Sequence, residues 1–156
     1  MQNKTIKSIR TIKSFSFFQN IEYLANNPLG SLVCINSEKH VFKERSIYIT
    51  NYICKLHLTS IKSYYEGISL VFSKEYKVPI VLSKNIILIH THRMDDYDNI
   101  WINYAMVERI SSENDKVVIQ FKSGKVLMVD INIAYLLKQI NKIERIVSYF
   151  EMIKCV

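Results

Sequence analysis

Histidine and aspartate gather in one short stretch of the sequence, which makes this stretch the first candidate for a metal-binding or catalytic site. His90-Thr91-His92 is followed by Asp95, Asp96 and Asp98. On a strand, His90 and His92 would point to the same face, as two metal ligands must. Zinc needs three or four fixed ligands with supporting partners, which a flexible Asp-rich loop supplies poorly. We therefore favour a solvated loop with a hydrogen-bonded histidine, and we expect no metal and no other cofactor.

Cysteine chemistry is the second candidate. Cys54 with His40 or His57 would supply a thiol and a base, but no oxyanion loop or orienting carboxylate accompanies them. The three cysteines are an odd number and form no Cys-x-x-Cys pair, which argues against a disulfide or zinc framework and favours a reduced, cytoplasmic setting. We interpret Cys54 as a buried structural residue and predict that the protein is not an enzyme.

Positive charge is concentrated in the first three-fifths of the chain. The net charge is +7, and up to Arg93 there are 13 Lys and Arg against 5 Asp and Glu, whereas from Met94 onward there are 8 against 9. A one-sided basic field attracts polyanions, either nucleic acid or an anionic membrane surface. The plain alternative is a soluble protein with a high pI.

Two groups of basic residues are candidates for DNA contact. The middle of the chain interleaves lysines with Tyr64, Tyr65 and Tyr76, a mixture that suits a nucleic-acid backbone. The first fifteen residues repeat a basic, hydroxyl, apolar triplet, which we interpret as a mobile or loosely packed arm over residues 1–20; an ordinary solvated terminus is the alternative. The candidate DNA-binding residues are Lys55, Lys62, Lys74, Lys77 and Lys84 in the middle segment, and Lys4, Lys7, Arg10 and Lys13 in the arm.

The elements that must position these residues are mostly short strands. Residues 21–27 read as a helical turn, and residues 90–99 as a loop. Strands are predicted at 29–35, 41–44, 47–53, 68–72, 86–89, 101–110, 117–121 and 126–131, with Pro79 at a strand start or edge. Trp101 is expected in the core. Lys122 to Lys125 would turn the last two strands into a hairpin.

The spacing of apolar residues changes from a strand-like to a helical period near the C-terminus. Apolar residues at three- and four-residue steps from Leu136 to Phe150 predict an amphipathic helix, which Asn132 could cap. Its polar stripe of Lys138, Lys142 and Arg145 suits either a phosphate backbone or, as we favour, a solvated helix face. The fold class is therefore α+β, with a mostly antiparallel β-sheet and a C-terminal helix, as a single domain over residues 21–156. No apolar run is long enough to span a bilayer.

An ordered set of short motifs gives the strongest functional signal. Over roughly residues 45–147 the set resembles the bacterial competence transcription factor (ComK) family. The matching motifs are Cys54-Lys55, Ser60, Lys77-Val78-Pro79-Ile80, Thr91, Trp101-Ile102 and the hairpin at 117–131.

The resemblance implies a DNA-binding transcriptional activator of competence genes, which serve DNA uptake. It implies recognition of paired AT-rich boxes in double-stranded DNA, largely through the minor groove, by a homo-oligomer. A-tract minor grooves are narrow and electronegative and attract Lys and Arg, and paired boxes call for paired protomers. The transcription machinery and regulatory adaptor or protease proteins are further implied partners, with no membrane partner.

The sequence departs from the family pattern at three places. Tyr64-Tyr65 stands where the family has an Arg-Lys pair, and Val78 and His90 each stand where it has proline. If residues 64–65 still face DNA, restoring Arg and Lys would raise the affinity; if they are buried, the two charges would destabilise the fold. The alternative function is a divergent member that acts by protein contact, as a partner or modulator with weak or no DNA binding.

Overall fold

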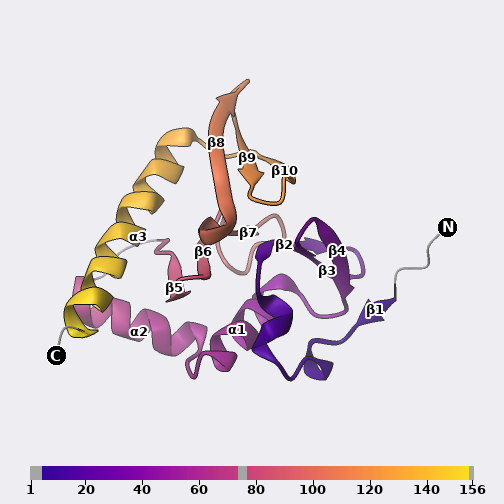
Figure 1. Cartoon of the computed structure of the whole chain (residues 1–156), viewed down its shortest axis with the longest axis horizontal. Coiled ribbons are helices and arrows are strands. Elements are labelled where there is room, and N and C mark those ends of the chain that lie inside the picture. Colours follow the sequence, from indigo (N-terminus) through magenta and orange to yellow (C-terminus); the bar gives the residue numbers. More distant parts are fainter. Residues whose placement is uncertain (1–4, 74–76, 155–156) are drawn as a thin grey trace.

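Ten strands and three α-helices make up the structure, a computed structural model that describes residues 5–73 and 77–154 (Figure 1). In chain order the elements are β1 (Ile6–Lys7), η1 (Ile9–Thr11), η2 (Phe15–Phe18), β2 (Ile21–Asn27), β3 (Gly30–Ile35), β4 (Glu38–Phe42), α1 (Ser46–Leu56), α2 (Ile61–Phe72), β5 (Ile80–Ser83), β6 (Ile86–His90), β7 (Ile100–Asn103), η3 (Tyr104–Met106), β8 (Val107–Glu113), β9 (Lys116–Phe121), β10 (Val126–Val129) and α3 (Ile133–Lys154).

The strands form two sheets. A seven-stranded sheet has the order β1-β4-β3-β2-β7-β6-β5, and a three-stranded sheet has the order β10-β9-β8. Every pairing is antiparallel except that of β1 with β4. The α+β class and the mostly antiparallel sheet are therefore confirmed.

The large sheet is covered on both faces, because successive residues of its strands enter different cores. Tyr23 and Ile102 belong to the core shared with β9, β10 and α3, whereas their neighbours Leu24 and Trp101 belong to the core shared with α1 and the N-terminal segment. Side chains alternate between the faces of a strand, so one sheet can separate two cores in this way. Trp101 is fully buried, as expected from the sequence.

Residues 47–53 were predicted as a strand, and this is wrong because they lie in α1. Their β-branched and aromatic side chains suggested β structure, but the buried positions of this segment are Ser46, Ile49, Thr50, Ile53 and Cys54. Steps of three and four residues place these side chains on one helical face. Burial of that face against the large sheet outweighs the small helix-propensity penalty of β-branched residues.

Residues 68–72 were also predicted as a strand and instead end α2. Ser60 caps this helix, since its Oγ accepts a hydrogen bond from the Ser63 backbone N–H at 3.0 Å. The helix lies beyond β5, the edge strand of the large sheet (Figure 1). Its Tyr64 hydroxyl donates to the Pro79 carbonyl at 2.8 Å and accepts from the Val81 N–H at 3.0 Å. Tyrosine hydroxyls thus complete a sheet edge that has no further strand.

Two other strand regions differ from the prediction. Residues 21–27 form β2 instead of a helical turn, because β2 lies between β3 and β7 and pairs with both. The predicted strand over residues 101–110 is interrupted by η3, where the chain leaves the large sheet and enters the small one.

The C-terminal part follows the prediction closely. β9 and β10 pair as the expected hairpin, with Val126 opposite Gln120. The α3 helix runs from Ile133 to Lys154, and the Asn132 side chain accepts a hydrogen bond from the Ala134 N–H at 2.7 Å, as a helix cap does. Among the described residues, no helix is both long and apolar enough to cross a lipid bilayer.

The N-terminal segment was predicted to be mobile or loosely packed, but from residue 5 onward it is fastened to the domain. β1 pairs with β4, and Ile9 and Phe18 are buried. Glu44 accepts hydrogen bonds from the Ser8 hydroxyl at 2.9 Å and from the Ile9 N–H at 2.8 Å. Apolar residues of the triplet repeat therefore serve as core contacts. The division of the chain at residue 20 stays a prediction.

Candidate nucleic-acid interface

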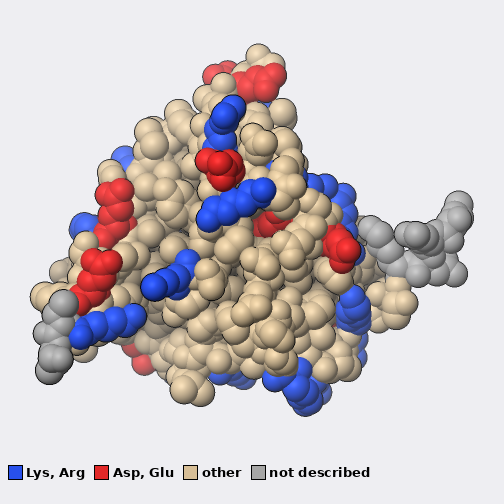
Figure 2. Space-filling view, in the orientation of Figure 1, with Lys and Arg blue, Asp and Glu red and all other residues tan. Residues whose placement is uncertain are grey.

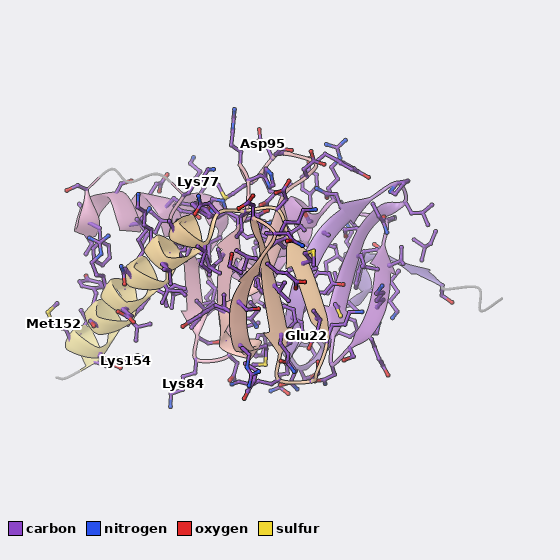
Figure 3. The ribbon with its side chains drawn as sticks, turned by 90° about the horizontal axis from the view of Figure 1, so that it is seen from above. Glu22, Lys77, Lys84, Asp95, Met152 and Lys154 are labelled. Atoms are coloured by element: carbon purple, nitrogen blue, oxygen red, sulfur yellow. The ribbon has the colours of Figure 1, made fainter. Side chains whose placement is uncertain are left out.

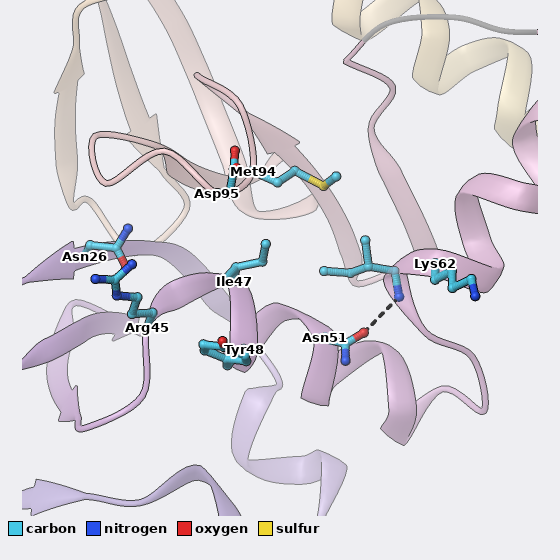
Figure 4. A pocket seen from close by; sticks show the side chains of 9 residues that line it. Asn26, Arg45, Ile47, Tyr48, Asn51, Lys62, Met94 and Asp95 are labelled. Carbon is cyan, nitrogen blue, oxygen red and sulfur yellow. Dashed lines mark hydrogen bonds between the residues drawn. The ribbon is translucent and has the colours of Figure 1, made fainter.

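A surface depression lies between the start of α1, the start of α2 and the loop of residues 91–99 (Figure 4). Its lining combines polar, charged and apolar side chains. The residues that line it are Asn26, Arg45, Ile47, Tyr48, Asn51, Ile61, Lys62, Met94 and Asp95.

Two asparagines fix the helices that form this depression. Asn26 accepts a hydrogen bond from the Ser46 N–H at 2.9 Å, which holds the start of α1, and donates to the Tyr97 carbonyl at 3.0 Å. Asn51 accepts from the Ile61 N–H at 2.9 Å, the dashed line in Figure 4, and so holds the start of α2 against α1. The first backbone N–H groups of a helix lack partners within the helix, so these side chains satisfy them.

The loop above the depression is braced by its own side chains. Asn99 accepts a hydrogen bond from the His92 N–H at 3.0 Å, and the Thr91 hydroxyl accepts from the Ile100 N–H at 2.9 Å. Asp96 accepts from the Asp98 N–H at 2.9 Å. Residues 93 and 94 are therefore presented on a loop whose backbone is tied at both ends.

Two further depressions adjoin the first, and Met94 lines all three. One extends along α2 past Glu66, and the other contains Lys77, His90 and Arg93. Across the three, the cations are Arg45, Lys62, Lys77 and Arg93, and the carboxylates are Glu66 and Asp95. The surface that these depressions form, called the Met94 groove below, is therefore net basic.

The ion pair within the Met94 groove is weak. Arg93 Nε lies 3.6 Å from an oxygen of Asp95, and the two side chains are 80% and 69% exposed. Exposed pairs of this kind contribute about 0–1 kcal/mol, so a phosphate oxygen competes readily for the guanidinium.

Lys77 is held at the edge of the groove by its neighbours. Its ammonium lies 5.3 Å from the centre of the Tyr135 ring, a cation–π contact, and the Tyr135 hydroxyl donates to the His90 carbonyl at 2.6 Å. Burial raises the pKa of Tyr135 to about 12, so this hydroxyl stays a donor at neutral pH. The charge of Lys77 remains accessible because its side chain is exposed.

The structure brings only part of the predicted set together. Lys62 and Lys77 both line the Met94 groove. Lys84 lies on the opposite side of the molecule from Lys77, as Figure 3 shows, and Lys55 is exposed near the end of α1. Neither of these two lysines lines the described depressions.

The basic residues of the N-terminal segment form a separate group. Lys7 donates to His40 Nδ1 at 2.6 Å and lies 5.6 Å from the centre of the Phe17 ring, so it is engaged within the protein. Arg10 and Lys13 are exposed. Lys4 and Lys74, with Tyr76, lie outside the described residues.

Sequence reasoning missed the arginines of the groove. Arg45 precedes α1, and Arg93 lies in the loop that carries the candidate metal ligands His92 and Asp95. Their side-chain chemistry could have identified them, because the planar guanidinium of arginine binds phosphate in a bidentate way that the ammonium of lysine cannot. Their convergence with Lys62 and Lys77 depends on tertiary packing, which no spacing in the sequence reveals.

The stripe on the last helix is a poor alternative interface. The Arg145 guanidinium packs 5.9 Å from the centre of the Phe72 ring. Figure 2 shows acidic side chains along α3 and at the tip of the β8–β9 hairpin, next to scattered Lys and Arg. The negative charges of Glu144 and Glu151 offset the positive charge of the stripe.

The histidine and cysteine groups are arranged for structural contacts. The His90 Nδ1 atom donates to the His92 carbonyl at 2.8 Å, and no group of three or more metal-ligating side chains occurs within the described ranges. Burial raises the pKa of the Cys34 and Cys54 thiols to about 11, which makes both poor nucleophiles. The His57 ring contacts the Ile53 carbonyl at 2.8 Å.

Comparison with known proteins identifies the family. The family model described as ComK protein matches residues 21–154, which is most of the chain. A search of curated proteins and a search of solved structures each gave no match. The chain therefore belongs to the ComK family and has the general role of a competence-related transcription factor.

Proposed function

We propose that this ComK-family protein is a cytoplasmic, DNA-binding transcriptional activator of competence genes. It binds paired AT-rich boxes largely through the minor groove, as a homo-oligomer, and catalyses no reaction. The Met94 groove meets the DNA backbone at one edge of the minor groove.

The observation that carries this proposal is the convergence of four cations on one braced surface. Arg45, Lys62, Lys77 and Arg93 come from four separate segments and line adjoining depressions. Phosphate contacts by Lys and Arg supply most of the affinity of such proteins and position them on the duplex. A narrow A-tract minor groove adds preference for AT-rich DNA through its stronger negative potential.

DNA titrations at several salt concentrations test the proposal. If all four groove cations meet phosphates, log Kd should change with log salt concentration with a slope of magnitude about 4, since each contact contributes about 0.9. Changing Lys62 and Arg93 together to Gln should lower that magnitude by about 2. The matched control, Lys55→Gln with Lys84→Gln, removes the same charge outside the depressions and should leave the slope nearer that of the wild type.

Specificity and assembly have their own readouts. Equal affinity for A-tract and GC-only duplexes at physiological salt would contradict minor-groove preference. Light scattering should show at least two protomers on a duplex with paired boxes, and a single bound protomer would contradict the oligomer.

A second candidate function is contact with a protein partner, without DNA binding. It is favoured by Tyr64 and Tyr65, which stand where the family pattern has cations and whose hydroxyls are engaged by backbone carbonyls. Exposed apolar side chains on α2 and α3, with Leu70 at 87% and Met152 at 63%, also suit a protein surface. A folded protein that binds no duplex even at low salt would favour this function over the first.

A further inference from the structure

The turn between α1 and α2 exposes a leucine in a backbone conformation that leucine rarely adopts. Leu58 is 96% exposed, more than any other large apolar side chain in the described part of the chain. Its φ is 64°, and the other non-glycine residues with positive φ in the described ranges are all polar. A bulky apolar residue is strained in this left-handed region, and an exposed side chain recovers none of that cost by packing.

The hydrogen bonds of this turn are those of a turn that favours glycine. The Leu58 N–H donates to the Lys55 carbonyl at 3.0 Å, and the Thr59 N–H donates to the Cys54 carbonyl at 3.1 Å. Together they form the Schellman motif that ends many helices, in which the left-handed residue is usually glycine. Because glycine would end α1 at least as well, the leucine side chain points to a contact outside the chain.

Leu58 stands on a rigid base beside the Met94 groove. The Schellman bonds tie the turn to α1, and the Asn51 side chain, which accepts from the Ile61 N–H at 2.9 Å, ties the start of α2 to the same helix (Figure 4). Ile61 and Lys62 both line the groove. Three residues of chain place the Cα atom of Leu58 at most about 11 Å from that of Ile61. The leucine is therefore next to the surface that is proposed to meet the DNA backbone.

The charge around the turn identifies the class of partner. From residue 45 to residue 65 the sequence contains Arg45, Lys55 and Lys62 but no Asp or Glu. A second copy of the chain would bring the same cations and be repelled, whereas a polyanion is attracted. Duplex DNA offers phosphates to these cations and apolar base faces to a leucine. Proteins that bind the minor groove often insert such a side chain between two base pairs, which partly unstacks them and kinks the duplex.

We propose that Leu58 inserts between two base pairs of an AT-rich duplex from the minor groove, while the cations of the Met94 groove hold the adjacent backbone. This inference rests on the proposed DNA-binding function and names the residue that reaches the bases. TA steps unstack more easily than other steps, so a TA step within the AT-rich box is the expected point of insertion.

The test uses two variants that suit the turn better than leucine does. Glycine and asparagine adopt the left-handed conformation readily, so Leu58→Gly and Leu58→Asn should fold and melt at about the wild-type temperature or above it. Both should bind an AT-rich duplex about tenfold more weakly, because they lose the apolar contact of the leucine. Leu70→Ala is the matched control, since it shortens a leucine that is 87% exposed on α2, and it should bind as the wild type does.

A duplex with 2-aminopurine at the TA step reports the insertion directly, because the fluorescence of this base rises when it loses its stacking. The signal should rise when the wild type or Leu70→Ala binds, and should stay low with Leu58→Gly at saturating concentration. Fluorescence energy transfer between the duplex ends should show a smaller bend with Leu58→Gly.

Three results would overturn the inference and leave the proposed function standing. They are a wild type that binds without any 2-aminopurine signal, a folded Leu58→Gly variant with wild-type affinity or signal, and a Leu58→Gly variant that loses only self-association in light scattering. The last result would assign Leu58 to a protein contact. Absence of duplex binding by the wild type at low salt would overturn both the inference and the proposed function.

Discussion

The Tyr64 hydroxyl gives the sharpest test of how the edge of the large sheet is held. Changing Tyr64 to Phe removes the oxygen that donates to the Pro79 carbonyl at 2.8 Å and accepts from the Val81 N–H at 3.0 Å. The Val81 N–H belongs to β5 and the Pro79 carbonyl directly precedes it; β5 ends the seven-stranded sheet, so no further strand replaces the hydroxyl. Pro79 and Val81 are both buried, which limits access by water.

The expected cost follows from these two orphaned groups. A buried polar group left without its hydrogen bond costs about 1–3 kcal/mol, so the two groups together should lower the free energy of unfolding of Tyr64→Phe by roughly 2–6 kcal/mol. For a chain of this size, each kcal/mol shifts the melting temperature by about 2–4 °C, which predicts a fall of about 4–24 °C.

Urea denaturation and thermal melting measure this change. Tyr97→Phe is the matched control, since Tyr97 is 52% exposed in the loop and its removal should change stability by less than about 0.5 kcal/mol. A Tyr64→Phe variant as stable as the control would show that the hydroxyl does not hold β5, and the account of the sheet edge would be wrong.

Three more outcomes follow from the same structure. Tyr64→Arg with Tyr65→Lys should lower the melting temperature by more than Tyr64→Phe, because charges replace half-buried rings that pack against both cores; a stable double variant with higher DNA affinity would instead place these positions at the DNA surface. Deleting residues 1–14 should destabilise the domain by at least about 2 kcal/mol, since it removes buried Ile9; unchanged urea unfolding would contradict this. Burial in the folded state lowers the pKa of His90, so its contribution to stability is complete above about pH 6.5 and is lost as the pH falls below that value. The melting temperature of the wild type should therefore fall more steeply towards pH 5 than the melting temperature of His90→Gln.

Sequence patterns predicted the elements whose local signals agree with their surroundings. The β9–β10 hairpin has a turn signal between two β-rich runs, and α3 combines a helical period with a cap at Asn132. α1 shows the opposite case. Its side chains prefer β structure, while its buried positions from Ser46 to Cys54 recur with a helical period. The helix forms because this period gathers the buried side chains on one face, which packs against the large sheet.

α2 and the groove were beyond reach for different reasons. Ser60 caps α2, but no helix was predicted there, because the β-branched and aromatic residues from Ile68 to Phe72 were interpreted as a strand. The Met94 groove has no local signal at all. Its cations stand at residues 45, 62, 77 and 93, and only the packing of α1, α2 and the loop brings them together.

The tyrosine pair connects the fold to the groove. Tyr64 and Tyr65 bind the carbonyls of Pro79 and Val78, the two residues that directly follow Lys77. Holding these carbonyls also fixes the backbone from which Lys77 reaches its contact with Tyr135. Under the proposed DNA-binding function, residues 64–65 therefore need no charge of their own, because they position the cation Lys77. It follows that Tyr65→Phe should weaken DNA binding mainly through Lys77. In a Lys77→Gln background the same change should still lower stability but should cost little further affinity for DNA. Equal losses of affinity in both backgrounds would show that Tyr65 does not act through Lys77.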